Sequence, residues 1–144
     1  MIAIAGNATA QAEGNSQQRS GWATRMLDYK HQLIAEKVNM TKAQQQRFMP
    51  LYEAMEQEIY NANRRARQQA QKVKALPNPT DEQYAQAAEA LSRVSLIEGQ
   101  ITQRYYEKFA QILSKKQLFL LKQAEIDFTR NMLSRGRNGV KKSK

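Results

Sequence analysis

The sequence contains no cysteine and a single histidine, His31. The lack of cysteine excludes disulfides, thiolate metal sites and a cysteine nucleophile. One imidazole cannot form a histidine-rich metal cluster, and we interpret His31 as a solvated or hydrogen-bonded side chain. We therefore predict no metal site and no cofactor.

Long apolar runs and catalytic motifs are also missing. No stretch of 18 consecutive apolar residues occurs, so we predict no membrane span. There is no G-x-S-x-G elbow, no glycine-rich phosphate loop, and no carboxylate pair singled out by its spacing. Glu53, Glu56 and Glu58 lie near Arg47 and Arg64 in the chain, which predicts solvated pairs on a helix face. We therefore predict that the protein is not an enzyme.

Glycine and proline are scarce, with 6 and 3 residues among 144, while 41% of the chain is hydrophobic. This composition is typical of a thin helical structure with a narrow buried seam. The length predicts one domain.

Three hydroxyl residues are each followed three positions later by a glutamine, at points where an apolar pattern restarts. This is the capping-box pattern, in which the hydroxyl and the amide pair with backbone N–H groups of the first helical turn. The pairs are Thr41 with Gln44, Thr80 with Gln83, and Ser114 with Gln117.

Apolar residues recur at three- and four-residue spacing after each of these starts, which predicts helices. Pro77 and Pro79 separate two such helices and mark a tip. On both sides of the tip the seam is rich in alanine, and it gains large residues away from the tip. We therefore predict an all-α fold: a long antiparallel hairpin from Thr41 to Ile112, with a shorter helix at each end folded on its foot in a cradle-like shape.

Three residues are expected to disturb these helices. Pro50 predicts a kink between Gln46 and Pro50, since it removes one backbone hydrogen bond. Gly99 predicts a bend or a close contact inside the third helix, and Gly136 predicts the end of the last helix.

The predicted domain boundaries follow from composition. Residues 1–12 are small, apolar and uncharged and end in Ala10-Gln11-Ala12, which is typical of a signal-peptide remnant; a floppy chain end is the alternative. We predict a disordered segment up to residue 21, one helical domain over residues 22–134, and a basic disordered tail over residues 135–144.

The net charge of +10 is concentrated in two places. No acid lies between Glu58 and Asp81, and the tail from residue 135 is also rich in Lys and Arg. Such patches favour an acidic partner: a protein surface, a lipid headgroup layer or nucleic acid. The cations of the first patch are Arg64, Arg65, Arg67, Lys72 and Lys74.

Two of the helix starts are copies of one short pattern: an apolar residue, a hydroxyl, two variable positions and a glutamine. The copies are Met40-Thr41-Lys42-Ala43-Gln44 and Leu113-Ser114-Lys115-Lys116-Gln117. They resemble the paired LTxxQ motifs of the Spy/CpxP family of bacterial periplasmic proteins, with Met for Leu in the first copy and Ser for Thr in the second.

This resemblance implies a cradle-shaped helical homodimer in the periplasm. It implies an ATP-independent chaperone for unfolding clients, or a regulator that restrains an envelope-stress sensor kinase. Metal binding, known for some relatives, is not carried over because His31 stands alone.

The residues predict how a client would be held. The patch from Arg64 to Lys74 would attract unfolded or acidic clients, while Met49 and Met55 would offer adaptable apolar contact. Two alternatives stay open: a patch that docks an acidic sensor domain, and a basic hairpin that binds nucleic acid. No aromatic residues are interleaved with the patch, which argues against single-strand binding.

Overall fold

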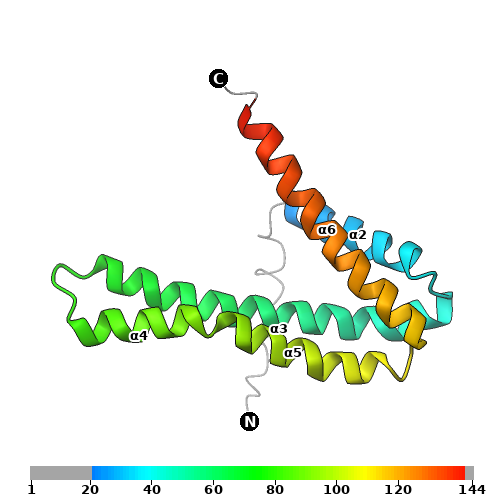
Figure 1. Ribbon diagram of the computed structural model, residues 1–144, viewed down its shortest axis with the longest axis horizontal. Coiled ribbons are helices and arrows are strands. Elements are labelled where there is room, and N and C mark those ends of the chain that lie inside the picture. The colour runs from blue at the N-terminus through cyan, green and yellow to red at the C-terminus, as the bar shows by residue number, and fades with distance from the viewer. Residues whose placement is uncertain (1–20, 142–144) are drawn as a thin grey trace, which may run out of the picture. The chain divides into compact units, whose positions relative to one another are not determined.

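In the computed structural model, residues 21–141 are described, and they contain helices and no strand (Figure 1). This confirms the all-α class. The predicted signal remnant and residues 142–144 lie outside the described residues. The helices are α2 (Gly21–Lys37), α3 (Lys42–Ala75), α4 (Asp81–Ser92), α5 (Val94–Phe109) and α6 (Lys115–Lys141).

The chain divides into two compact units. One spans residues 39–120 and holds α3, α4, α5 and the first turns of α6. The other joins the chain up to Val38 with the part of α6 from Leu121 onward. The cradle-like shape and the docking of the end helices on the hairpin's foot stay predictions.

All three predicted capping boxes are present. The Thr41 N–H donates to Gln44 Oε1 at 3.0 Å, and the Gln44 N–H donates to Thr41 Oγ1 at 3.1 Å. The same reciprocal pair of bonds joins the hydroxyl residue and the glutamine at the other two helix starts. Backbone donors that would otherwise be unpaired are thus satisfied where α3, α4 and α6 begin.

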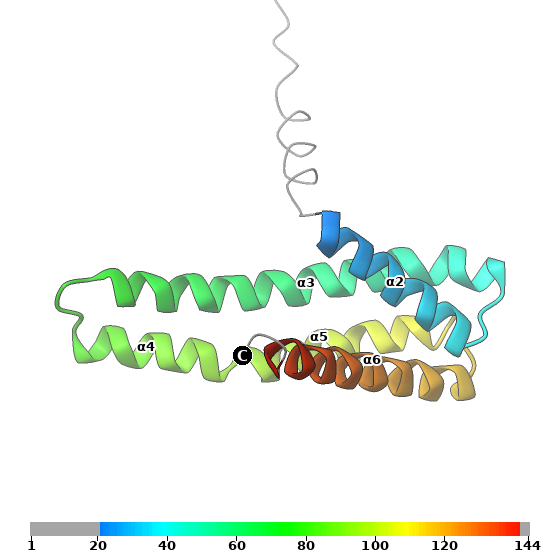
Figure 2. The same cartoon turned by 90° about the horizontal axis from the view of Figure 1, so that it is seen from above.

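In the larger unit α3 packs against α4 and α5, which return along it after the turn at residues 76–80 (Figures 1 and 2). At the far end from that turn, Phe48, Tyr52 and Phe109 are almost fully buried, and the Phe48 and Phe109 ring centroids lie 4.7 Å apart. Near the turn the buried residues include Ala66 and Ala87. The apolar contact is therefore thinner near the turn, since alanine buries little surface.

The third helix is interrupted at Arg93, whereas one helix from Thr80 to Ile112 was expected. The Ser92 hydroxyl donates to the Glu89 carbonyl at 2.8 Å, a bond that competes with the regular helical pattern. Gly99 lies inside α5, and no atom of another helix lies within 4 Å of the position a Cβ would take, so the predicted close contact is wrong.

Two other helix breakers lie inside helices. Pro50 is within α3, which continues without interruption to Ala75. α6 passes through Gly136 to Lys141, so the predicted stop at Gly136 is wrong and residues 135–141 are helical. Gly136 does not adopt the positive φ of a glycine cap, so it does not end the helix there.

In the smaller unit α2 packs on α6. The Tyr29 and Phe128 ring centroids lie 6.5 Å apart, and Lys37 Nζ lies 3.8 Å from an Asp127 carboxylate oxygen. Leu121 and Ala124 of α6 are buried, as is Ile34 of α2. Among the described helices, none combines the length and apolar character needed to cross a membrane.

Candidate functional site

A shallow groove of about 460 Å³ lies in the larger unit, between α3 and the α4–α5 junction. Ala62, Ala66 and Ala90 form its small-residue lining, so the groove is a direct consequence of the alanine-rich seam. The remaining lining residues are Arg65, Gln69, Gln86, Glu89, Arg93, Val94 and Ile97.

Four of the five predicted client-binding cations straddle the seam of α3. Ala66 and Val73 are buried and seven residues apart, which places them on one face of the helix. Arg65 and Lys72 each precede one of these residues, and Arg67 and Lys74 each follow one. At 100° per residue the cations form two rows, one on each side of the seam, and the Arg65 side borders the groove.

The cations on α3 are available to a partner. Arg64, Arg65, Arg67, Lys72 and Lys74 are exposed, and none has an ion-pair partner within residues 21–141. On the opposite wall, Arg93 is held by Glu89 at 2.7 Å. Positive charge therefore exceeds negative charge around the groove.

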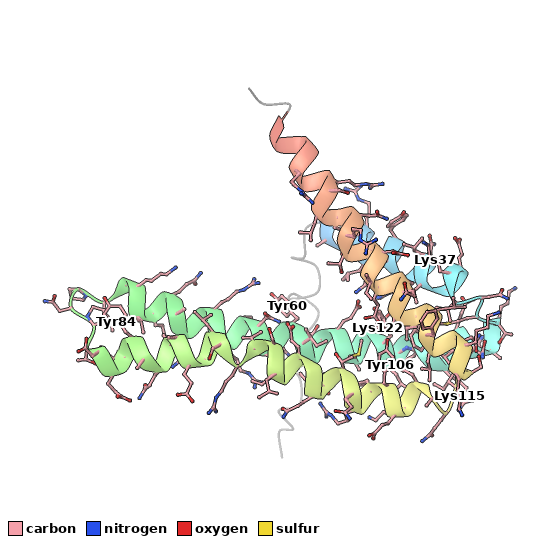
Figure 3. The ribbon with its side chains drawn as sticks, in the orientation of Figure 1. Lys37, Tyr60, Tyr84, Tyr106, Lys115 and Lys122 are labelled. Carbon is pink, nitrogen blue, oxygen red and sulfur yellow. The ribbon has the colours of Figure 1, made fainter. Side chains whose placement is uncertain are left out.

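Apolar side chains accompany these charges. Val94 and Ile97 line the groove, and Ile97 is 38% exposed. Tyr60 lies seven residues before Arg67 and is therefore on the same side of α3, while Tyr84 lies on α4 near the turn (Figure 3). Both tyrosines are more than half exposed. The surface thus combines charge with apolar contact area.

The two predicted methionines do not belong to this surface. Met55 is 3% exposed and is a core residue, so its predicted role in client contact is wrong. Met49 is half-buried and lies 15 residues before Arg64, roughly 22 Å along a helix. Met55 was assigned to client contact because methionine side chains are adaptable, but its spacing from Phe48 and Tyr52 places it in the core with them.

Glu58 has partners other than the predicted Arg47 and Arg64. Its carboxylate accepts hydrogen bonds from Tyr105 Oη and from Arg104, each at 2.6 Å. The bond from Tyr105, followed by the bond from Arg104, lowers the pKa of Glu58 below its usual value. The same bond raises the pKa of Tyr105. This cluster joins α3 to α5.

The two copies of the helix-start pattern, 40–44 and 113–117, meet in the larger unit. Gln44 Nε2 donates to Gln117 Oε1 at 2.9 Å, and Gln117 Nε2 donates back to Gln44 Oε1 at 2.9 Å. The side-chain amide of Gln44 also donates to the Ile112 carbonyl, and that of Gln117 also donates to the Asn39 carbonyl. Each carbonyl lies two residues before the hydroxyl residue of the other motif. The apolar members Met40 and Leu113 are both buried. The six motif residues therefore form one nearly symmetric junction.

Within the part of the chain that the structure describes, no group of His, Asp or Glu residues is placed to hold a metal ion. The groove and the cations suit non-covalent contact with an acidic, partly apolar chain. Comparison with protein-family models, with curated proteins and with solved structures gives no match.

Sequence reasoning missed the groove wall on α4 and α5. The alanine seam indicated close helix approach near the tip, but the break at Arg93 has no strong local signal, because Ser92, Arg93 and Val94 include no proline or glycine. That break lies beside Val94 and Ile97, which line the groove.

Proposed function

We propose that the protein is an ATP-independent periplasmic chaperone of the Spy/CpxP type, which holds unfolded or acidic clients on the basic surface of α3. The observation that carries the proposal is the junction of the two LTxxQ-like motifs. Each motif opens a helix, and their glutamines are joined by reciprocal hydrogen bonds at 2.9 Å. The resemblance thus involves a repeated pattern whose two copies are in contact.

The surface near the turn supports the holdase role. Unpaired cations attract acidic segments over about 8–10 Å at physiological salt, and the exposed tyrosines and Ile97 offer apolar contact. Many weak contacts suit a client that must still be released to fold. Pairing with a second copy, as the resemblance implies, would add burial for exposed apolar residues such as Leu91 and Leu96.

The test is suppression of aggregation of several unrelated denatured enzymes without ATP. We expect protection at near-stoichiometric amounts of chaperone. Charge reversal at Arg64→Glu, Arg65→Glu and Arg67→Glu should weaken it several-fold while leaving the circular dichroism spectrum unchanged. The matched control reverses three exposed arginines of α6: Arg130→Glu, Arg135→Glu and Arg137→Glu.

Other outcomes would support one of the two alternative functions, or would remove the assignment to α3. A regulator of a sensor kinase would bind one acidic ectodomain tightly and protect no denatured enzyme. A nucleic-acid-binding protein would retain DNA or RNA with an affinity that falls steeply with salt. Equal loss in both triple variants would remove the assignment to α3, because net charge alone would then explain capture.

A further inference from the structure

The outward face of α6 carries apolar and basic side chains in alternation. Phe119, Ile126 and Leu133 recur every seven residues and are 63%, 42% and 64% exposed. Since seven residues make nearly two turns, they lie along one side of the helix. Basic residues lie three or four positions from these apolar residues and therefore on the same side of the helix: Lys115, Lys122, Arg130 and Arg137.

This row is separate from the apolar stripe that holds α6 in the fold. Leu121 and Ala124 are buried, at 0% and 1% exposure. Successive residues turn by 100°, so Ile126 lies about 140° around the helix from Leu121. α6 therefore has two apolar stripes, of which the outer one has no role in the described core.

The net charge of α6 is strongly positive. The helix contains seven basic residues and two acids, Glu125 and Asp127. Both acids are already engaged, Glu125 with Lys122 and Asp127 with Lys37, each at 3.8 Å. Arg130 and Arg137 have no acidic partner among residues 21–141. Figure 3 labels Lys115 at the beginning of the helix and Lys122 two turns further on.

We propose that this face of α6 binds the surface of an anionic lipid bilayer, with the helix lying in the headgroup plane. Apolar side chains backed by Lys and Arg are typical of helices that lie at such interfaces. The long stems of Lys and Arg reach from the apolar boundary to the phosphates, so alternation within one face is compatible with shallow insertion.

The spacing favours lipid over protein. The three apolar side chains are about 10 Å apart along the helix axis, so they do not form one continuous patch for a rigid partner. Fluid acyl chains can surround each of them separately. A second copy of α6 is disfavoured, because pairing would bring two strongly basic surfaces together.

The test is co-sedimentation of the full chain with vesicles. The probes are equimolar phosphatidylglycerol and phosphatidylcholine, and phosphatidylcholine alone, each at low and high salt. We expect binding to the anionic vesicles that weakens with salt. Each surface cation contributes about fivefold to partitioning, so Arg130→Gln with Arg137→Gln should reduce binding by about 25-fold. Ile126→Gln with Leu133→Gln should also reduce it at least tenfold, since both lose apolar insertion.

Two matched controls remove equal charge or apolar area elsewhere: Lys42→Gln with Arg47→Gln at the start of α3, and Leu76→Gln with Leu96→Gln at the turn and on α5, all exposed. Both should retain nearly full vesicle binding. The proposal is overturned if the full chain ignores anionic vesicles, if it binds neutral vesicles equally well, or if controls and α6 variants lose binding alike. Loss of an acidic protein partner in the α6 variants, without vesicle binding by the full chain, would make this face a protein-docking surface instead.

Discussion

At the scale of single residues, the surroundings of Glu58 favour the charged form of its carboxyl group. The hydrogen bonds from Tyr105 and Arg104 stabilise its carboxylate and lower its pKa in the folded protein. A depressed carboxyl pKa contributes stability that is present above the unfolded-state value, near 4.5, and is lost as the pH falls through the folded-state value.

We therefore expect the melting temperature to fall as the pH drops below about 4.5, and Glu58→Gln to reduce this dependence. Thermal melts across an acidic pH series give the measurement. Glu107→Gln, an exposed change on α5, is the control and should keep the wild-type profile. Identical profiles for wild type and Glu58→Gln would show that the carboxylate does not supply the acid sensitivity.

Gly99 supplies a second prediction at this scale. It lies in the interior of α5, is exposed, and has open space where a Cβ would be added. Glycine in a helix interior costs about 1 kcal/mol relative to alanine because its unfolded chain is more flexible. Gly99→Ala should therefore raise the free energy of unfolding by about that amount in a denaturant titration. A loss of stability would contradict the open space around Gly99.

At the scale of elements, the glutamine junction couples the start of α3 to the start of α6. Gln44→Ala and Gln117→Ala each remove half of the reciprocal amide pair, so that the remaining, partly buried glutamine loses the two hydrogen bonds that joined it to the other. Each should destabilise the protein by about 1–3 kcal/mol. The double variant should cost clearly less than the sum, because the second substitution removes groups that the first has already orphaned.

Equilibrium unfolding of the two single variants and the double variant provides the measurement. Gln83→Ala, in the capping box of α4, is the control, since Gln83 bonds within its own box. Its effect should add to that of Gln44→Ala. Additivity of the Gln44 and Gln117 substitutions themselves would mean that the two motifs act only as separate helix caps.

These elements also show what the sequence can predict and why the rest escapes it. Thr41, Thr80 and Ser114 were predictable because a capping box is a local arrangement, complete within four residues. The meeting of Gln44 with Gln117 was not, because those residues are 73 positions apart and the pattern describes each copy alone. Gly136 failed as a stop signal, since glycine permits a cap conformation without imposing it.

The client-binding prediction is likewise correct where it depends on local sequence and wrong where it depends on distant contacts. The cations of α3 are exposed as expected, because a charge run on a helix seldom becomes buried without partners. Met55 was misassigned because the sequence pattern of a methionine at helical spacing is the same in a core as on a surface. Only the partner helices decide this, and they come from distant parts of the chain.

At the scale of the whole molecule, the excess of positive charge is the property that most affects association. The first patch lies on α3 near its end, and the described part of the second patch belongs to α6. Residues outside the two patches carry as many acids as bases. Charge-driven binding should therefore arise from these two helices and not from a diffuse positive surface.

This distribution predicts a specific salt dependence of client capture. Screening shortens the reach of exposed charges from about 10 Å at 0.1 M salt to about 3 Å at 1 M, so capture of an acidic client should weaken across that range. The triple variant Arg64→Gln, Arg65→Gln, Arg67→Gln should bind more weakly at low salt and respond less to salt, whereas Arg130→Gln, Arg135→Gln, Arg137→Gln should keep the wild-type response. Binding titrations of one acidic denatured client at several salt concentrations provide the comparison. If wild type and the α3 variant lost affinity in parallel with salt, those arginines would not be in contact with the client, and the salt-sensitive part of capture would come from other exposed cations such as Lys72 and Lys74.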